Sequence, residues 1–193
     1  MAIAQQAGLE GTTKALAIWC YGGNKILTWG HPDYGADCFA TVKSVQAVQK
    51  VQASARAFAA ILGEGSVVTW GHPGYGGDSS TVRDQLKEVR HVQATSKAFA
   101  AILADGSVVT WGHPDFGGDS SKVPSHVKNV RQLKCTERAF AAILSDGTVV
   151  AWGDPRYGGD SSEVHGQLRS VTQLEATEFA FAAILADTWL CLR

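Results

Sequence analysis

The chain has 193 residues, of which 18% are charged, and its formal net charge is -1 at pH 7. A near-neutral chain produces no global field that would draw it to nucleic acid, to a membrane surface or to an acidic partner. Its four cysteines lie far apart and form no CxxC pair, which argues against a zinc site or a dense disulfide framework and favours a reducing compartment.

The N-terminal segment, residues 1–13, lacks the basic start and apolar core of a secretory leader. The longest apolar runs, such as AFAAILA at 98–104, are too short to span a bilayer. We therefore expect a soluble intracellular protein, cytoplasmic or nuclear, in which this segment precedes a repeat domain at 14–193.

Trp-Gly pairs set the period of the repeat. Each tryptophan follows the previous one by 41 residues, at Trp29, Trp70, Trp111 and Trp152. A fixed period of about 40 residues indicates supersecondary units that stack on their neighbours, because a unit this small cannot bury its apolar faces alone. The units are taken as 14–54, 55–95, 96–136 and 137–177, with an unfinished unit at 178–193.

Each full unit contains the signals of a β-hairpin. The run FAAIL at 99–103 is apolar on both alternating faces, which suits a strand in a sheet that is covered on both sides. An Asp-Gly or Glu-Gly pair separates this run from a second β-prone run, and the glycine of such a turn accepts positive φ. The predicted turn glycines are Gly65, Gly106 and Gly147, and the predicted core residues are Phe58, Phe99, Phe140 and Phe181 with the four repeated tryptophans.

A loop of the pattern HPxYGGDSS follows the hairpin in the two central units, as HPGYGGDSS at 72–80 and as HPDFGGDSS at 113–121, and it is dense in turn-forming residues. We expect it to form an ordered loop that leaves the sheet. The segments after it, at 81–89 and 122–130, fit either a helical turn or a short edge strand, and the sequence leaves both readings open.

Several short strands per unit, a glycine-ended hairpin and a closing Trp-Gly fit the blades of a β-propeller. The pattern Val89-x-x-Val92-x-Ala94, then Phe99-Ala100-Ala101-Ile102-x-x-Asp105-Gly106-x-Val108-x-x-Trp111-Gly112, resembles the repeat of the regulator of chromosome condensation family. This resemblance covers residues 14–193. It departs from the family in its short unit, in Gly-Gly-Asp-Ser-Ser at 117–121 where the family has Gly-Gln-Leu-Gly, and in Phe99 where the family often has histidine.

The resemblance implies a rigid propeller whose exposed loops bind other proteins. Members of that family include an exchange factor for a nuclear GTPase, a plant ultraviolet-B receptor and the repeat regions of HECT-type ubiquitin ligases. This chain has no room for a HECT catalytic domain. If it is similar to such a ligase, it corresponds to the substrate-binding or regulatory part.

The loops supply the candidate binding residues: His72, Tyr75, Asp78, His113, Phe116, Asp119, Asp154, Tyr157 and Asp160. A hydrolase would use a serine nucleophile with a histidine base, but a set that recurs in every unit is typical of turn capping rather than of one asymmetric site. The repeated aspartates lie in different units, too far apart to share a metal ion unless they face a narrow channel, so an Asx-type turn is favoured. We expect no catalytic site, cofactor or metal.

Two further patterns have structural explanations. One tryptophan per unit fits packing between blades better than a light-sensing cluster at an interface. The basic run Lys122, Lys128, Arg131, Lys134 and Arg138 fits a solvated face better than a nucleic-acid surface, because no exposed aromatic residues alternate with it.

The sequence therefore predicts a non-enzymatic protein-binding scaffold that presents its loops and the segments 81–91 and 122–132 to a partner protein. A regulator of enzyme chemistry, either an exchange factor for a small GTPase or a ligase repeat segment, is the alternative. At the C-terminus, Thr188 replaces the turn glycine. We therefore expect an open or incompletely closed array that self-associates through its apolar ends.

Overall fold

The computed structural model describes residues 7–20, 25–36, 45, 47–119 and 127–186. These residues form four three-stranded antiparallel sheets and one two-stranded sheet, with only short 3-10 helices between them. The prediction of an all-β, propeller-like array of repeats is confirmed. In chain order the strands are β1 (Ala7–Gly11), β2 (Ala15–Cys20), β3 (Ile26–Gly30), β4 (Lys50–Ala53), β5 (Ala57–Ile61), β6 (Val67–Gly71), β7 (Val89–Ala94), β8 (Ala98–Leu103), β9 (Val108–Gly112), β10 (Val130–Cys135), β11 (Ala139–Leu144), β12 (Val149–Gly153), β13 (Val171–Ala176) and β14 (Phe181–Leu185).

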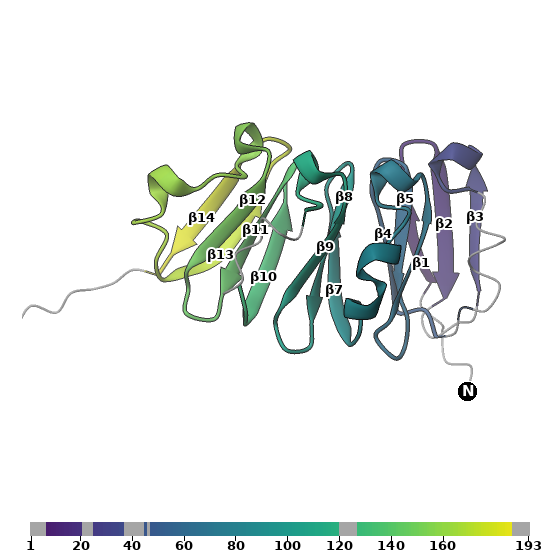
Figure 1. Ribbon diagram of the computed structural model, residues 1–193, viewed down its shortest axis with the longest axis horizontal. Coiled ribbons are helices and arrows are strands. Elements are labelled where there is room, and N and C mark those ends of the chain that lie inside the picture. Colours follow the sequence, from purple (N-terminus) through teal and green to yellow (C-terminus); the bar gives the residue numbers. More distant parts are fainter. Residues whose placement is uncertain (1–6, 21–24, 37–44, 46, 120–126, 187–193) are drawn as a thin grey trace, which may run out of the picture.

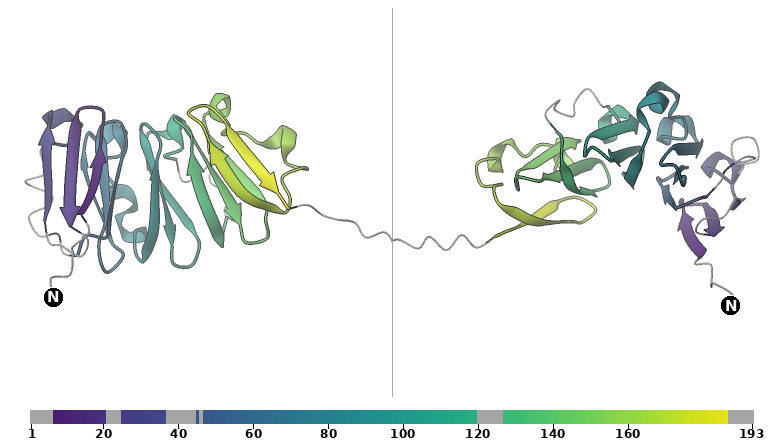
Figure 2. Two further views of the ribbon diagram at one scale, coloured as in Figure 1. Left: turned by 180° about the vertical axis from the view of Figure 1, so that it is seen from behind. Right: turned by 90° about the horizontal axis from the view of Figure 1, so that it is seen from below.

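The sheets stand side by side in chain order, with the first and the last at opposite ends of the array (Figure 1). Seen from below, they follow an arc, and the described residues do not close it into a ring (Figure 2). Strand β1 lies within residues 1–13, which the sequence set apart from the repeats. It pairs with β2 from Ala7 opposite Cys20 to Gly11 opposite Leu16, so these residues supply the first strand of the first sheet.

Each hairpin tip joins one sheet to the next. Gly106 has φ of 78° at the tip between β8 and β9, and its amide donates to the Leu103 carbonyl at 3.0 Å. Its own carbonyl accepts from the amide of Val130, the first residue of β10, at 3.0 Å. Gly65 and Gly147 have φ of 81° and 80° and accept in the same way from Val89 and Val171. The turn glycines therefore set both the hairpin and the entry of the following sheet.

Each sheet has two faces, which we name by their side chains. The front face bears the Phe-Trp pair, as in Phe58 opposite Trp70 across β5 and β6. The back face bears the alternate residues of the central strand, which are Ala57, Ala59 and Ile61 in β5. Each buried front face packs against the back face of the preceding sheet, and the apolar clusters of the core are these interfaces. Small alanines let the sheets approach closely, as expected for a strand covered on both sides.

The Phe-Trp pair anchors each front face. The rings of Phe99 and Trp111 are stacked with their centroids 5.2 Å apart, and Phe99 is fully buried. The Trp111 indole Nε1 donates a hydrogen bond of 3.0 Å to the carbonyl oxygen of Gly76, in the turn that follows the preceding sheet. A Cβ at Gly76 would lie 2.5 Å from the Phe99 ring, so only glycine allows this approach. The pairs Phe58-Trp70 and Phe140-Trp152 repeat the arrangement against Gly35 and Gly117.

Two of the predicted core residues do not lie in the core. Trp29 is 48% exposed, because it belongs to the front face of the first sheet and no described sheet precedes it. Trp19, on the back face of that sheet, is the buried tryptophan there. Phe181 is only half-buried, since the described fifth sheet offers it no stacked tryptophan. The predicted repeat of the Phe-Trp core is therefore wrong at both ends of the array.

Candidate binding rim

The residues after each third strand form the same tight turn. The turns η1 (Pro32–Tyr34), η2 (Pro73–Tyr75), η4 (Pro114–Phe116) and η6 (Pro155–Tyr157) are single 3-10 turns, and they lie along one edge of the array, at the top of Figure 1. We call them the rim turns. In η2, His72 Nδ1 accepts a hydrogen bond from the Gly74 amide at 3.1 Å. Gly76 then ends the turn with φ of 87°.

The other rim turns use the same caps. His31 and His113 accept from the amides of Asp33 and Asp115, and Asp154 accepts from the Arg156 amide at 3.0 Å. Arg156 also donates to both carboxylate oxygens of Asp154, which holds the pKa of Asp154 below its ordinary value. The histidines and Asp154 are therefore capping groups, and their recurrence follows from the need of each turn for an acceptor.

Cations and aromatic rings alternate along this rim. Their order is Lys14, Tyr34, Arg56, Tyr75, Lys97, Phe116, Arg138 and Tyr157. The Arg56 guanidinium lies 4.7 Å from the centroid of the Tyr34 ring and 4.9 Å from that of Tyr75. Such contacts contribute about 0.5 to 1 kcal/mol each at exposed sites. This cation-aromatic ladder links the first three rim turns to the sheets that follow them.

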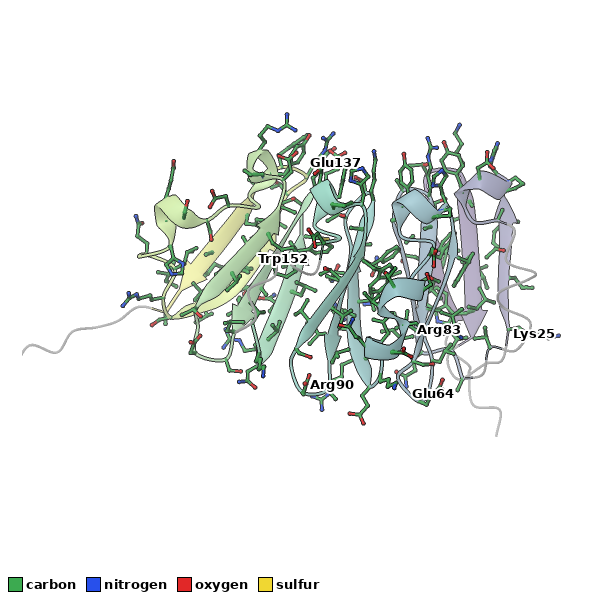
Figure 3. All side chains as sticks on the ribbon, viewed as in Figure 1. Lys25, Glu64, Arg83, Arg90, Glu137 and Trp152 are labelled. Atoms are coloured by element: carbon green, nitrogen blue, oxygen red, sulfur yellow. The ribbon has the colours of Figure 1, made fainter. Side chains whose placement is uncertain are left out.

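Sequence reasoning missed most of these cations as members of a site. Arg56, Lys97 and Arg138 recur with the same period of 41 residues as the tryptophans, and this recurrence was the available signal. Phe179 takes the next position of that series, and its ring lies 5.5 Å from the ring of Tyr157. The cations come from the turn between the first and second strands, so the ladder becomes visible only when successive sheets are stacked. Glu137, beside Arg138, marks this upper rim in Figure 3.

The rim combines a fixed frame with variable tips. Each rim turn exposes one variable residue, two positions after the capping residue. This residue is Asp33, Gly74, Asp115 or Arg156. The caps, aromatic rings and glycines around them are nearly the same in each turn. Neighbouring tips therefore display different charge on the same backbone.

Two of the loop aspartates, Asp78 and Asp160, are engaged in local turns. Asp78 and Asp160 each accept from the amide two residues on, Ser80 and Ser162, at 2.9 Å, and these bonds lower the pKa of both carboxyl groups. Ser79 is buried and shares a hydrogen bond of 3.0 Å with Thr69. Asp119 is half-buried at the end of a described stretch. Among the described residues, no cluster of three or more His, Cys, Asp and Glu could hold a metal ion.

The segment after the second rim turn is a 3-10 helix, η3 (Ser80–Gln85), which buries Val82, with Leu86 buried just beyond its end. Residues 122–126 lie outside the described residues. The basic run is not simply a solvated face: Arg131 donates to the carbonyls of Val171 and Thr172, and Lys134 lies 2.9 Å from Glu175. These cations therefore link the fourth sheet to the fifth.

A polar row runs along the first strands of successive sheets. Gln52 Nε2 donates to Glu10 at 3.3 Å, and the Cys135 thiol lies 3.1 Å from the Ala94 carbonyl oxygen. Burial raises the pKa of Cys135 to about 11, so this thiol is not a reactive nucleophile at neutral pH. The row supports stacking of the sheets and offers no catalytic group.

Comparison of the sequence with protein-family models finds no match, and neither does a search of curated proteins. Solved structures do match. The CRINKLY WD40 ectodomain of the Arabidopsis thaliana receptor kinase ACR4 has a TM-score of 0.59 at 14% identity, over 92% of this chain and 58% of that one. Prp20p from Saccharomyces cerevisiae has a TM-score of 0.57 at 17% identity, over 92% and 55%.

A second structure, of Kap60 bound to yeast RCC1 (Prp20), gives a TM-score of 0.59 at 16% identity, over 92% of this chain and 53% of that one. At such low identity the likeness shows the fold alone. The chain spans little more than half the length of these propellers. No helix among the described residues is long and apolar enough to cross a membrane. The array is therefore a partial β-propeller built of blade-like sheets.

Proposed function

We propose that this chain is a non-catalytic protein-interaction module and that the rim turns are its binding surface. The observation that supports the proposal most is the pairing of a repeated backbone with exposed tips of different charge. A rigid scaffold loses little entropy on binding, and its variable side chains supply the specificity. The likeness to Prp20p, whose structure is described with its binding to Gsp1p and histones, supports protein binding as the class of function.

Affinity capture with the full chain as bait tests this proposal. One variant reverses two exposed rim acids, Asp33→Arg and Asp115→Arg. Its matched control reverses two exposed acids at the hairpin tips, Glu64→Arg and Asp105→Arg, which changes the net charge equally. Glu64 lies at the opposite edge of the array (Figure 3). We expect proteins captured by the unmodified chain to be lost from the rim variant and kept by the control, as measured by quantitative mass spectrometry.

Capture that is identical for all three baits would contradict the rim as binding surface. The captured proteins also separate the two regulatory alternatives that the sequence resemblance implies. A small GTPase among them, with nucleotide release stimulated by substoichiometric amounts of this chain, would indicate an exchange factor. Components of the ubiquitin pathway would indicate the repeat segment of a ligase.

A further inference from the structure

No described residue covers the front face of the first sheet. Its apolar side chains Leu9, Leu16, Leu27 and Trp29 are 61%, 38%, 63% and 48% exposed. These residues lie on one face, because Leu16 is opposite Trp29 across β2 and β3, and both Leu9 and Leu27 are opposite Ile18. An apolar face of this kind is unusual on a free surface and indicates an interaction site.

The strand registers show what this face is built to contact. Leu16 and Trp29 pair as Phe58 and Trp70 do in the second sheet, one residue from the end of the ladder. By the same registers, Leu9 takes the place of Val51. Val51, Phe58 and Trp70 are at most 2% exposed, because the back face of the first sheet covers them. The bare front face therefore has the same residue pattern as the faces that pack on a back face.

At the other end of the array, no described residue covers the back face of the fifth sheet. In the fifth sheet Ile184 is 52% exposed, and it is paired with Gln173, while Ala182 is paired with Glu175. The fourth sheet has the same pattern, with Ile143 paired with Gln132 and Ala141 with Lys134. There, Ala141 and Ile143 are buried against the fifth sheet. The two ends of one chain thus present the two halves of the interface that recurs throughout its interior.

We propose that the chain assembles head to tail, with the front face of the first sheet of one copy packed on the back face of the fifth sheet of a second copy. The occupant of each bare face is another copy of this chain, because each end matches the chemistry of the other. A heterologous contact of this type does not limit itself to a dimer, so association continues until a ring closes or a filament forms. This assembly is independent of the rim, which lies along a different edge.

Two variants and their mixture test the proposal. Leu27→Glu blocks the front face, and Ile184→Lys blocks the back face. Both side chains are more than half exposed in the single chain, so neither substitution removes core packing. Val164→Glu is the matched control, since Val164 is also exposed, at 45%, but lies in the short helix η7 (Ser162–Val164) outside both end faces.

Sedimentation velocity over a wide concentration range gives the readout. We expect the unmodified chain and Val164→Glu to form species larger than a dimer as concentration rises, and each end variant to remain a monomer with an unchanged melting temperature. An equimolar mixture of the two end variants retains one intact front face and one intact back face. It should therefore form a dimer and nothing larger.

Three results would overturn the proposal. The unmodified chain could stay monomeric throughout, which would fit closure of the array on itself. Both end variants could associate like the unmodified chain, which would locate the contact elsewhere. The mixture could stay monomeric although the unmodified chain associates, which would indicate an interface between like faces. None of these outcomes bears on capture of a partner by the rim.

Discussion

Backbone conformation decides which residues the hairpin tips accept. Gly65, Gly106 and Gly147 have positive φ at the tips, and a Cβ on Gly106 would lie 2.6 Å from the Asn129 Cα. A second position, just before the first strand of the next sheet, also has positive φ. It is not a glycine and is occupied by Ala47, Glu88, Asn129 or Ser170. Non-glycine residues cost about 1 to 2 kcal/mol in this region, so the two positions respond to substitution in opposite directions.

Gly106→Ala should destabilise the chain by more than about 1 kcal/mol, because strain at positive φ adds to the clash with the Asn129 backbone. Ser107→Ala is the control, since Ser107 has no positive φ and its hydroxyl bonds only the exposed Asp105. Urea unfolding of both variants measures the difference. Equal losses of stability would contradict the hairpin geometry described here.

Glu88→Gly should stabilise the chain by a few tenths to about 1 kcal/mol, because relief of strain at φ of 52° exceeds the greater entropy that glycine loses on folding. Lys87→Gly, at an exposed neighbouring position without positive φ, should instead lower stability. Thermal melts followed by circular dichroism compare the two variants. A lower melting temperature for Glu88→Gly would show that the strain is absent.

At the scale of the strand and sheet, the interior interfaces are equivalent and the ends are not. Phe99 is fully buried and stacked on Trp111, whereas Phe181 is half-buried. Phe99→Ala should therefore cost about 3 to 5 kcal/mol, the range for truncating a buried aromatic residue. Phe181→Ala should cost less than half as much. A loss below about 1 kcal/mol for Phe99→Ala in denaturant unfolding would refute the front-to-back packing.

His91 lies in the polar row along the first strands, and its pKa predicts that the stability of the fold depends on pH. Burial, with the nearby charge of Lys50 as the second cause, holds the pKa of His91 below its ordinary value of 6.5. The unfolded chain therefore binds a proton at a higher pH than the folded chain, and stability falls as pH drops below about 6.5. His91→Gln removes this contribution. Its free energy of unfolding, measured beside that of the unmodified chain at pH 7.5 and 5.5, should fall less over this interval. Parallel decreases in both proteins would contradict the burial of His91.

For the molecule as a whole, the sequence predicts each repeat unit but not the contacts between neighbouring units. The spacing of 41 residues and the Asp-Gly pairs suffice for the repeat and the hairpins, because both are local signals. Burial of Trp29 depends on a sheet that would precede it, and the ladder depends on a cation of one sheet reaching the ring of another. A contact between two units leaves no signal within either unit. The periodic recurrence of Arg56, Lys97 and Arg138 was therefore the only trace of the ladder, although the loops that carry its rings were predicted.

Binding of a partner protein by the rim turns can be measured by hydrogen-deuterium exchange of the chain with and without a captured partner. We expect slower exchange on binding in peptides from the rim turns, at 31–36, 72–77, 113–118 and 154–159. Exchange should stay unchanged at the hairpin tips of the opposite edge, at 63–66, 104–107 and 145–148. Protection confined to these tips or to the first strands, with none at the rim turns, would show that the partner binds elsewhere.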